Sequence, residues 1–522
     1  MVHVWARGCL YDVVVSISDL EVLVSELRAV IVELRAQLVE RDAIIAAQAE
    51  VIAELRSEVA DLKARMGKDS GNSSAPPSRD RVDRRERRAG EREARKAARV
   101  ADGSPARQPG KQPGAPGSTL RRREPDVVVR HRPTGCGGCG RSLTGARVVG
   151  VATRQVIEVP VPRAVVTDHV VERCRCACGR EAAGSFPTEA TGPTCWGPRA
   201  KAVAAYLMAR QHLPLERCAE AMAVLFDCPI GEGTLAGLLP DAADRLEPFL
   251  AELARLLQAE PVVYADETSI RVGTGLNWIH TISTDLFTLL ACHRTRGIDA
   301  ITDIGVLNHY RGVIVHEGLN VYGCPELADA VHAQCGAHLL RYLAAVGVYW
   351  KFTGWTTAMR KVLLDAKTAA EHAHAAGLDH VPPLIAAAIR ARYTQVIADA
   401  FTTMPAGPPP RRRNRGGWTH NDRDAWNLVC RFRDQHDQIL LLLDNTQVRF
   451  DNNEAERSLR MAKLHDKIAG AFRNPGHAEA FCTVRSYIQT GRKHTVDTLD
   501  NLTRLWTTAT PWLPTVATAD TG

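Results

Sequence analysis

The sequence predicts a multidomain α+β protein with an amino-terminal coiled coil, a small cysteine-rich domain, a helical region, and an α/β core interrupted by further helices. Three observations lead to this prediction: a heptad repeat, two clusters of cysteines, and a group of strands that carry acidic residues. At 522 residues and 57.0 kDa, the chain is also too long for one compact core and should fold as several domains.

Composition excludes some classes of protein. Hydrophobic residues make up 45% and charged residues 24%, which is a globular balance. The net charge of +7 is concentrated between residues 67 and 125, where 16 Lys and Arg face 8 Asp and Glu. The sequence contains no run of 18 apolar residues, so it predicts no membrane span. The first residues lack the basic start of a secretion signal, so we expect a cytoplasmic rather than a secreted protein.

Residues 18–66 form the predicted coiled coil. β-Branched residues at most first heptad positions and Leu at most fourth positions favour a parallel dimer. Arg41 and Gln48 interrupt the fourth-position series. The alternative is a single amphipathic helix that packs on its own domain. The residues that recur every seven positions are Val24, Ile31, Leu38, Ile45, Ile52, Val59 and Met66.

A basic linker rich in Pro, Gly and Arg is predicted for residues 67–125. Its arginines are candidates for contact with a DNA phosphate backbone, although a solvated linker with internally neutralised charges is the alternative. The candidate DNA-binding residues here are Arg84, Arg85, Arg87 and Arg88.

Residues 126–190 are predicted to form a zinc ribbon. Cys136 and Cys139 have the usual C-x-x-C spacing, and C-x-C-x-C follows at residues 174–178. Two strands, at 154–160 and 165–171, are expected between these turns. We predict a structural Zn²⁺ on Cys136, Cys139, Cys176 and Cys178. Cys178 precedes a glycine, as in the first turn, which leaves Cys174 spare; scattered buried thiols are the alternative.

Residues 191–258 have the pattern of short helices separated by Pro and Gly turns. They could form a helix-turn-helix that contacts DNA or a packing module, and the sequence does not separate these alternatives.

The first part of the core, residues 259–338, has three predicted strands, a short helix at 299–307 and a fourth strand. Strands are expected at 261–272, 277–283, 286–292 and 312–318. Asp266 lies on the first strand and Glu317 at the end of the fourth. This is the ribonuclease-H-like layout, in which carboxylates hold two Mg²⁺ ions.

A third carboxylate is expected from a helix in the last part of the core, residues 450–510. The segment Asp451-Asn-Asn-Glu-Ala-Glu-Arg457 supplies Glu456 or Glu454. Glu456 also has capping-box spacing from Asn453, so a purely structural role is the alternative.

Several motifs in order resemble the insertion-sequence-66 family of bacterial transposases, a DDE group, from about residue 20 to residue 502. They include the coiled coil and cysteine ribbon, and the segments Gln211-His-Leu-Pro-Leu-Glu-Arg217, Asp266-Glu-Thr268, Val315-His-Glu-Gly318, Cys335-Gly-Ala-His338, Asp451-Asn-Asn-Glu-Ala-Glu-Arg457 and Ala469-Gly-Ala-Phe-Arg473.

The resemblance implies that Asp266 is the first catalytic Asp and Glu456 the catalytic Glu. Residues 339–449 would be the helical insertion that such enzymes place before that Glu. A basic run in the insertion offers a DNA-facing loop or a solvated one; its candidate DNA-binding residues are Arg411, Arg412 and Arg413. Cys335 and His338 match the family's C-x-x-H, with a metal-binding or a positioning role.

One position departs from the family pattern, because Glu317 stands where the family has Asp. The added methylene moves the carboxylate, and Mg²⁺ requires near-ideal octahedral geometry. Two functions follow. The first is a transposase that uses Mg²⁺ or Mn²⁺ to cleave and join DNA at the element's terminal repeats and a target. The second is an impaired remnant that only binds DNA. The resemblance also implies accessory proteins from the same element, and a location in the bacterial cytoplasm in association with the nucleoid.

Overall fold

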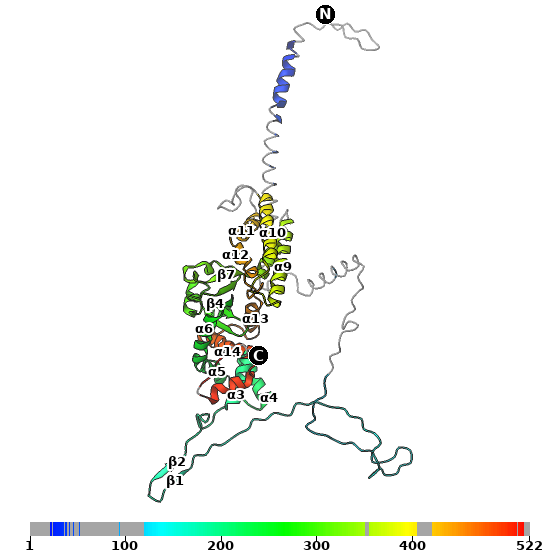
Figure 1. Cartoon of the computed structure of the whole chain (residues 1–522), viewed down its shortest axis with the longest axis vertical. Coiled ribbons are helices and arrows are strands. Elements are labelled where there is room, and N and C mark those ends of the chain that lie inside the picture. Colours follow the sequence, from blue (N-terminus) through cyan, green and yellow to red (C-terminus); the bar gives the residue numbers. More distant parts are fainter. Residues whose placement is uncertain are drawn as a thin grey trace. The chain divides into compact units, whose positions relative to one another are not determined.

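A computed structural model describes residues 120–349, 354–404, 420–508 and 510–515, together with residues 21–22, 24–35, 37–38, 41, 45, 48, 52 and 93. It divides into two compact units. In one, residues 313–322 and 331–452 contribute two strands and a set of helices. In the other, residues 82–312, 323–330 and 453–522 contribute the remaining strands and helices (Figure 1). No helix among the described residues is long and apolar enough to cross a membrane.

The larger unit contains an antiparallel meander of three strands. β3 (Val262–Val272) pairs with β4 (Gly275–Ser283), which pairs with β5 (Thr288–His293). The first four residues of β3 are apolar and at most 7% exposed, as expected of a strand covered on both faces. The short helix α7 (Ile298–Ile304) follows and ends at Gly305, whose φ of 75° is a left-handed helix terminus.

Two helices from the end of the chain, α13 (Asn453–Ile468) and α14 (Pro475–Lys493), pack against this meander. Four helices that precede the meander in the sequence, and the last helix of the chain, pack further out. α14 protects the edge of β5, since Ser486 Oγ accepts the Leu290 N–H at 2.8 Å and Thr490 Oγ1 accepts the Thr288 N–H at 3.1 Å. The helices are α3 (Pro198–Ala209), α4 (Leu215–Phe226), α5 (Glu232–Asp244), α6 (Glu247–Ala259), α13 (Asn453–Ile468), α14 (Pro475–Lys493) and α15 (Thr498–Thr507).

The smaller unit has two parallel strands, β6 (Val313–His316) and β7 (Val331–Gln334), and a group of helices. The buried Tyr393 hydroxyl donates to the Phe432 carbonyl at 2.8 Å and ties two of these helices together. The helices are α8 (Gly336–Tyr349), α9 (Gly354–Ala375), α10 (Pro383–Thr402), α11 (His420–Asp434) and α12 (His436–Ile439).

The core strands follow the order β5-β4-β3-β6-β7, which makes a mixed sheet. The α+β prediction is therefore confirmed, and the arrangement is consistent with a ribonuclease-H-like core. All four predicted core strands are present. The sequence analysis missed β7, because its four residues include two polar side chains and give too short a pattern.

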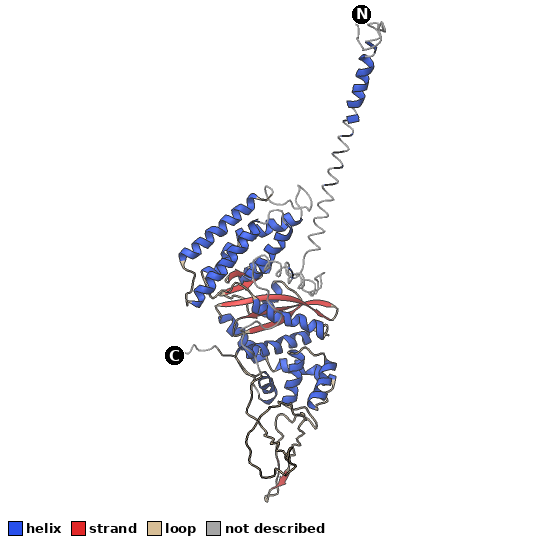
Figure 2. Cartoon of the chain, turned by 90° about the vertical axis from the view of Figure 1, so that its right-hand side faces the viewer, coloured by secondary structure: helices blue, strands red, loops and turns tan. Residues whose placement is uncertain are grey.

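The predicted strands at 154–160 and 165–171 are wrong. The structure has no strand in either range; its only strands in this region are β1 (Arg173–Arg175) and β2 (Glu181–Ala183), a small hairpin drawn within a segment of loop (Figure 2). Val156 and Val165 are 84% and 91% exposed. β-Branched residues favour a sheet only where it has a surface to cover, and these valines cover none.

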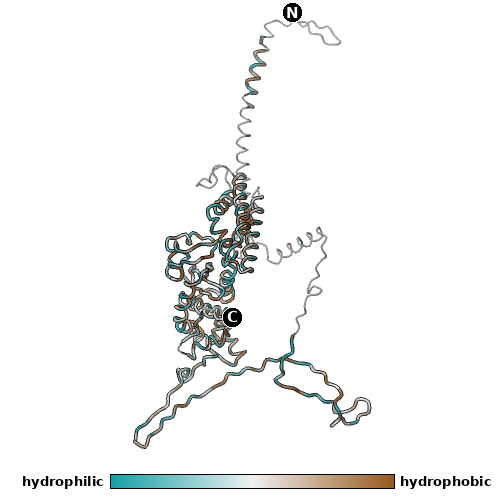
Figure 3. The backbone as a smooth tube through the Cα atoms, viewed as in Figure 1, coloured by the Kyte–Doolittle hydropathy of each residue, from teal (hydrophilic) through white to brown (hydrophobic). Residues whose placement is uncertain are grey.

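The described residues between 21 and 52 are helical, and hydrophobic residues recur along them (Figure 3). Val24, Ile31, Leu38, Ile45 and Ile52, all first heptad positions, are 44–61% exposed. The helix therefore does not bury this series within the chain. The rest of the predicted coiled coil, including Val59 and Met66, lies outside the described residues.

Candidate active site

Asp266 and Glu267 lie side by side on β3, and both are buried at 8% exposure. The Asp266 carboxylate accepts the Glu267 N–H at 2.9 Å, which fixes its orientation. Arg296 lies 3.5 Å from Glu267, whose side chain is only 2% exposed, and stacks over Trp278 at 4.8 Å. A buried carboxylate needs such a counter-charge.

A neutral histidine borders the same strand. His280 is opposite Glu267 in the β3–β4 register. Burial lowers the pKa of His280 to about 4, and its Nε2 lies 3.1 Å from the Thr295 carbonyl. Arg296 is therefore the positive charge that this neighbourhood supplies at neutral pH.

Glu456 lies in the first turn of α13, with 11% of its side chain exposed, and its carboxylate is 3.2 Å from Arg460. The other candidate, Glu454, is more exposed at 26% and pairs with Arg457 at 3.2 Å and Lys493 at 3.4 Å. Glu456 is therefore the better placed of the two for a buried site.

α13 runs beside β3 in the same direction. Leu459 and Ala462 of α13 pack with Ile270 and Val272 of β3 in one buried cluster. Further along both elements, the Gly273 N–H donates to the Phe472 carbonyl at 2.7 Å. The chain therefore runs in the same direction along α13 and β3. The Gly273–Phe472 hydrogen bond holds the C-terminal end of the helix in place.

This alignment brings Glu456 level with Asp266. Lys463 donates to Ser269, with 3.1 Å between Nζ and Oγ. Glu456 precedes Lys463 by two helical turns, or about 10.5 Å, and lies on the same helix face. Asp266 precedes Ser269 by three strand residues, or about 10 Å. The first and third predicted catalytic acids therefore occupy the same level of two packed elements.

Glu317 follows β6 directly, and 14% of its side chain is exposed. Its carboxylate is 3.3 Å from His338 Nε2, and its main-chain carbonyl accepts from Arg431 at 2.6 Å. His338 is buried at 5% exposure and opens α8 together with Cys335, at 1%. His338 of the C-x-x-H motif thus contacts Glu317, and the two roles that the sequence gave this motif, metal binding and positioning, stay predictions.

Gly318 is required by this arrangement. Its φ of +85° is in the left-handed region. A Cβ at this position would overlap the Arg431 guanidinium, with its Cζ at 2.6 Å. The glycine lets Arg431 lie close enough to bind the carbonyl of Glu317.

Each of the two cysteine turns ends in a glycine directly after its second cysteine, and the first turn is one residue longer. The Gly140 N–H donates to the Cys136 carbonyl at 2.8 Å, and the Gly179 N–H donates to the Cys176 carbonyl at 2.9 Å. Both glycines have positive φ, at 73° and 86°. Backbone N–H groups that point at sulfur lower the pKa of Cys136 and of Cys176, as zinc knuckles do.

Cys174 lies outside the second turn, on β1 opposite Ala182, and its assignment as a spare thiol stays a prediction. Among the described residues, no three of the four proposed zinc sulfurs are near enough to share an ion. The zinc site therefore stays a prediction. The candidate DNA-binding arginines 84, 85, 87, 88, 411, 412 and 413 lie outside the described residues.

A comparison with known protein families shows to which family the chain belongs. The model described as "Transposase IS66 family" matches residues 193–480, which is more than half of the chain. The chain belongs to the IS66 transposase family. That membership implies DNA transposition, DNA binding and a divalent-metal requirement.

The IS66 match includes β3, β6 and α13, and thus all three predicted catalytic acids. A second model, for a family of unknown function (DUF6444), matches residues 15–114. No curated protein matches the chain.

Proposed function

We propose that this chain is an active DNA transposase that cleaves element ends and transfers the freed strand to target DNA, with Asp266, Glu317 and Glu456 as its three catalytic acids. The main support for the proposal is that Asp266 and Glu456 lie at the same position along two elements that pack together, β3 and α13. Membership of the IS66 family supports it independently.

The strand order supports Glu317 as the second acid. β3 and β6 are neighbours in that order, and Asp266 and Glu317 are their acids. Asp266, Glu267 and Glu317 also form a group of three carboxylates that could hold a divalent metal ion. Carboxylate oxygens suit Mg²⁺ or Mn²⁺. When bound, such ions would supply Lewis acidity to a phosphoryl oxygen and activate the attacking oxygen.

The remaining residues position these acids. Arg296 compensates the charge of buried Glu267, so that the strand can hold two adjacent carboxylates. His338 and Arg431 fix the side chain and main chain of Glu317. Lys463 fixes α13 against β3, which sets the height of Glu456. Catalysis of strand cleavage then depends mostly on positioning.

DNA and a second copy of the chain are the proposed partners. Arg84, Arg85, Arg87 and Arg88, with Arg411, Arg412 and Arg413, would contact phosphates. The exposed heptad residues would pair two chains through a parallel coiled coil, so that both element ends are held together. Cys136, Cys139, Cys176 and Cys178 would hold a structural Zn²⁺, and the support is the glycine with positive φ directly after Cys139 and directly after Cys178.

One observation favours the second function, an inactive DNA-binding remnant. Glu317 is longer than the family's Asp and already lies 3.3 Å from His338, so the longer side chain has a structural partner. A binding protein would keep this pair and have no need of the metal.

The test is a strand cleavage and joining assay on labelled element-end DNA in Mg²⁺ and in Mn²⁺. The native chain should cut, and Glu456→Gln should bind the same DNA without cutting it. The matched control is Glu454→Gln, two residues away, which should keep its activity. If only Glu317→Asp cuts, this copy is disabled at that residue. If no variant cuts while all bind, the DNA-binding function replaces the transposase.

A further inference from the structure

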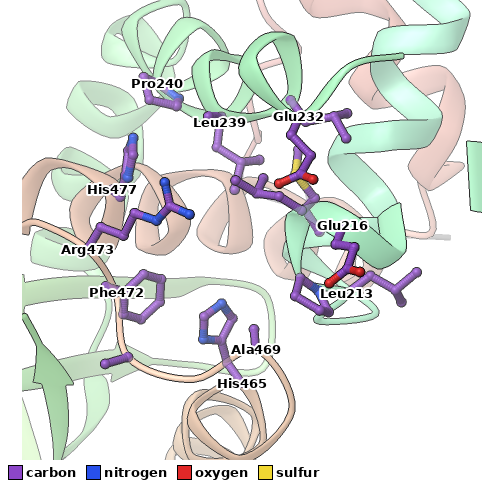
Figure 4. Close-up of a pocket in the computed structure, with 16 residues that line it drawn as sticks. Leu213, Glu216, Glu232, Leu239, Pro240, His465, Ala469, Phe472, Arg473 and His477 are labelled. Carbon is purple, nitrogen blue, oxygen red and sulfur yellow. The ribbon is translucent and has the colours of Figure 1, made fainter. Parts of the chain in front are cut away.

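A pocket of about 310 Å³ lies away from the catalytic acids, within the larger unit (Figure 4). The first turns of α4 and α5 form one side of it. The end of α13 and the segment leading into α14 form the other. Two motifs shared with the family but so far without a role, at 211–217 and 469–473, both contribute to its lining.

An arginine and a histidine face two carboxylates across this pocket. Arg473 and His477 lie on one side, and Glu216 and Glu232 on the other (Figure 4). Within the described part of the chain, none of these four side chains has an ion pair or a side-chain hydrogen bond. Charged groups without partners around a concave site are available to a ligand.

The surface between the charges is apolar. Leu235, Leu239 and Phe472 line it, and Phe472 stacks on His465 with ring centroids 4.3 Å apart. The pocket therefore offers a positive side for an anion, a negative side for hydrogen-bond donors and an apolar surface for a flat ring. Its volume is at the lower end of the range of small-molecule sites.

We propose that this pocket takes one nucleotide unstacked from the element-end DNA, with its phosphate on Arg473 and His477 and its base on Glu216 and Glu232. Carboxylates accept hydrogen bonds from the exocyclic amino groups of adenine, cytosine and guanine, whereas thymine offers only its ring N3–H, so we expect thymine to bind least well. The proposal deepens the proposed function and rests on it, because it supplies recognition of the DNA that the acids cut.

The position of the nucleotide follows from α13, which links the pocket to the catalytic acids. His465 at the pocket lies nine residues after Glu456, a rise of about 13.5 Å along the helix. Duplex DNA advances about 3.4 Å per base pair, so the two points are about four base pairs apart. The unstacked nucleotide is thus expected within about five base pairs of the element end.

The experiment scans 2-aminopurine, a fluorescent base that brightens when unstacked, along the terminal repeat. Full-length protein binds each DNA without added Mg²⁺ or Mn²⁺, so the result does not depend on metal at the catalytic acids and the proposed structural Zn²⁺ is kept. The pocket variants are the double change Glu216→Gln with Glu232→Gln, and Arg473→Gln. The controls are Glu220→Gln, an exposed residue of α4 outside the pocket, and Arg492→Gln, an exposed residue of α14.

We expect one position near the element end to brighten severalfold with native protein and both controls. The pocket variants should lose this signal and bind the DNA on the order of tenfold more weakly, with unchanged thermal unfolding. Thymine at that position should weaken binding in native protein but not in the Glu216/Glu232 double variant.

Other outcomes overturn the proposal. No brightened position, or a signal kept in both pocket variants, refutes the nucleotide while DNA binding and cleavage by the native chain would still support the transposase. A double variant that changes oligomeric state but not DNA binding assigns the pocket to a protein side chain instead. Native protein that does not bind the element ends refutes both proposals.

Discussion

Replacing Gly318 with alanine tests how the protein positions Glu317. At φ +85° a Cβ costs about 1–2 kcal/mol. The same Cβ displaces Arg431, whose 2.6 Å hydrogen bond to the Glu317 carbonyl contributes about 1.5–3 kcal/mol as a charged donor. Gly318→Ala should therefore destabilise the protein by about 3–5 kcal/mol and move Glu317, and a shift of about 1 Å can cost on the order of 100-fold in rate.

Gly377→Ala is the matched control, because Gly377 also has positive φ, +73°, but no atom lies within 4 Å of its added Cβ. It carries the backbone strain without displacing a side chain. The assays are thermal unfolding and end cleavage in Mg²⁺. We expect Gly318→Ala to lower the unfolding midpoint by about 5–10 °C and to lose cleavage, while Gly377→Ala keeps its activity. Equal behaviour of the two variants would refute the positioning role of Arg431.

Three further predictions concern other parts of the chain. Lys463→Met should reduce cleavage about tenfold with little change in DNA binding, since it frees α13 from Ser269; an unchanged rate would show that the helix height is set without this contact. Cys176→Ser should lower the bound zinc measured by metal analysis, whereas Cys174→Ser should not, and the reverse result would exchange the two assignments. Burial lowers the pKa of His212 and of His465 to about 4 in the folded protein, so only the unfolded chain takes up these protons as pH falls from about 6.5. The free energy of unfolding should thus fall between pH 6.5 and 4, by up to about 3 kcal/mol for each histidine. His212→Asn, which tolerates the left-handed backbone there, should flatten this dependence in urea titrations at each pH, and an unaltered slope would exclude His212 as its source.

The sequence predicted the order of the core elements because each has a strong local pattern. The apolar start of β3, the turn after β4 and the acid that ends β6 are readable within a few residues, and the structure has all three. The local pattern gave a wrong prediction at residues 154–171. The valines there indicated strands, but they are exposed and do not form a sheet. The local pattern also failed at β7, which is too short to show a period.

By itself, the sequence determined the order along the chain of the three acids proposed for metal binding, Asp266, Glu317 and Glu456. Only the tertiary structure decided that Lys463 meets Ser269, which brings Glu456 level with Asp266, and that His338 and Arg431 fix Glu317. It also decided that Glu216 and Arg473, 257 positions apart in the sequence, line one pocket. The reason is physical. Helical and strand periods act between near neighbours, whereas these contacts depend on how separate elements pack, which no local pattern encodes.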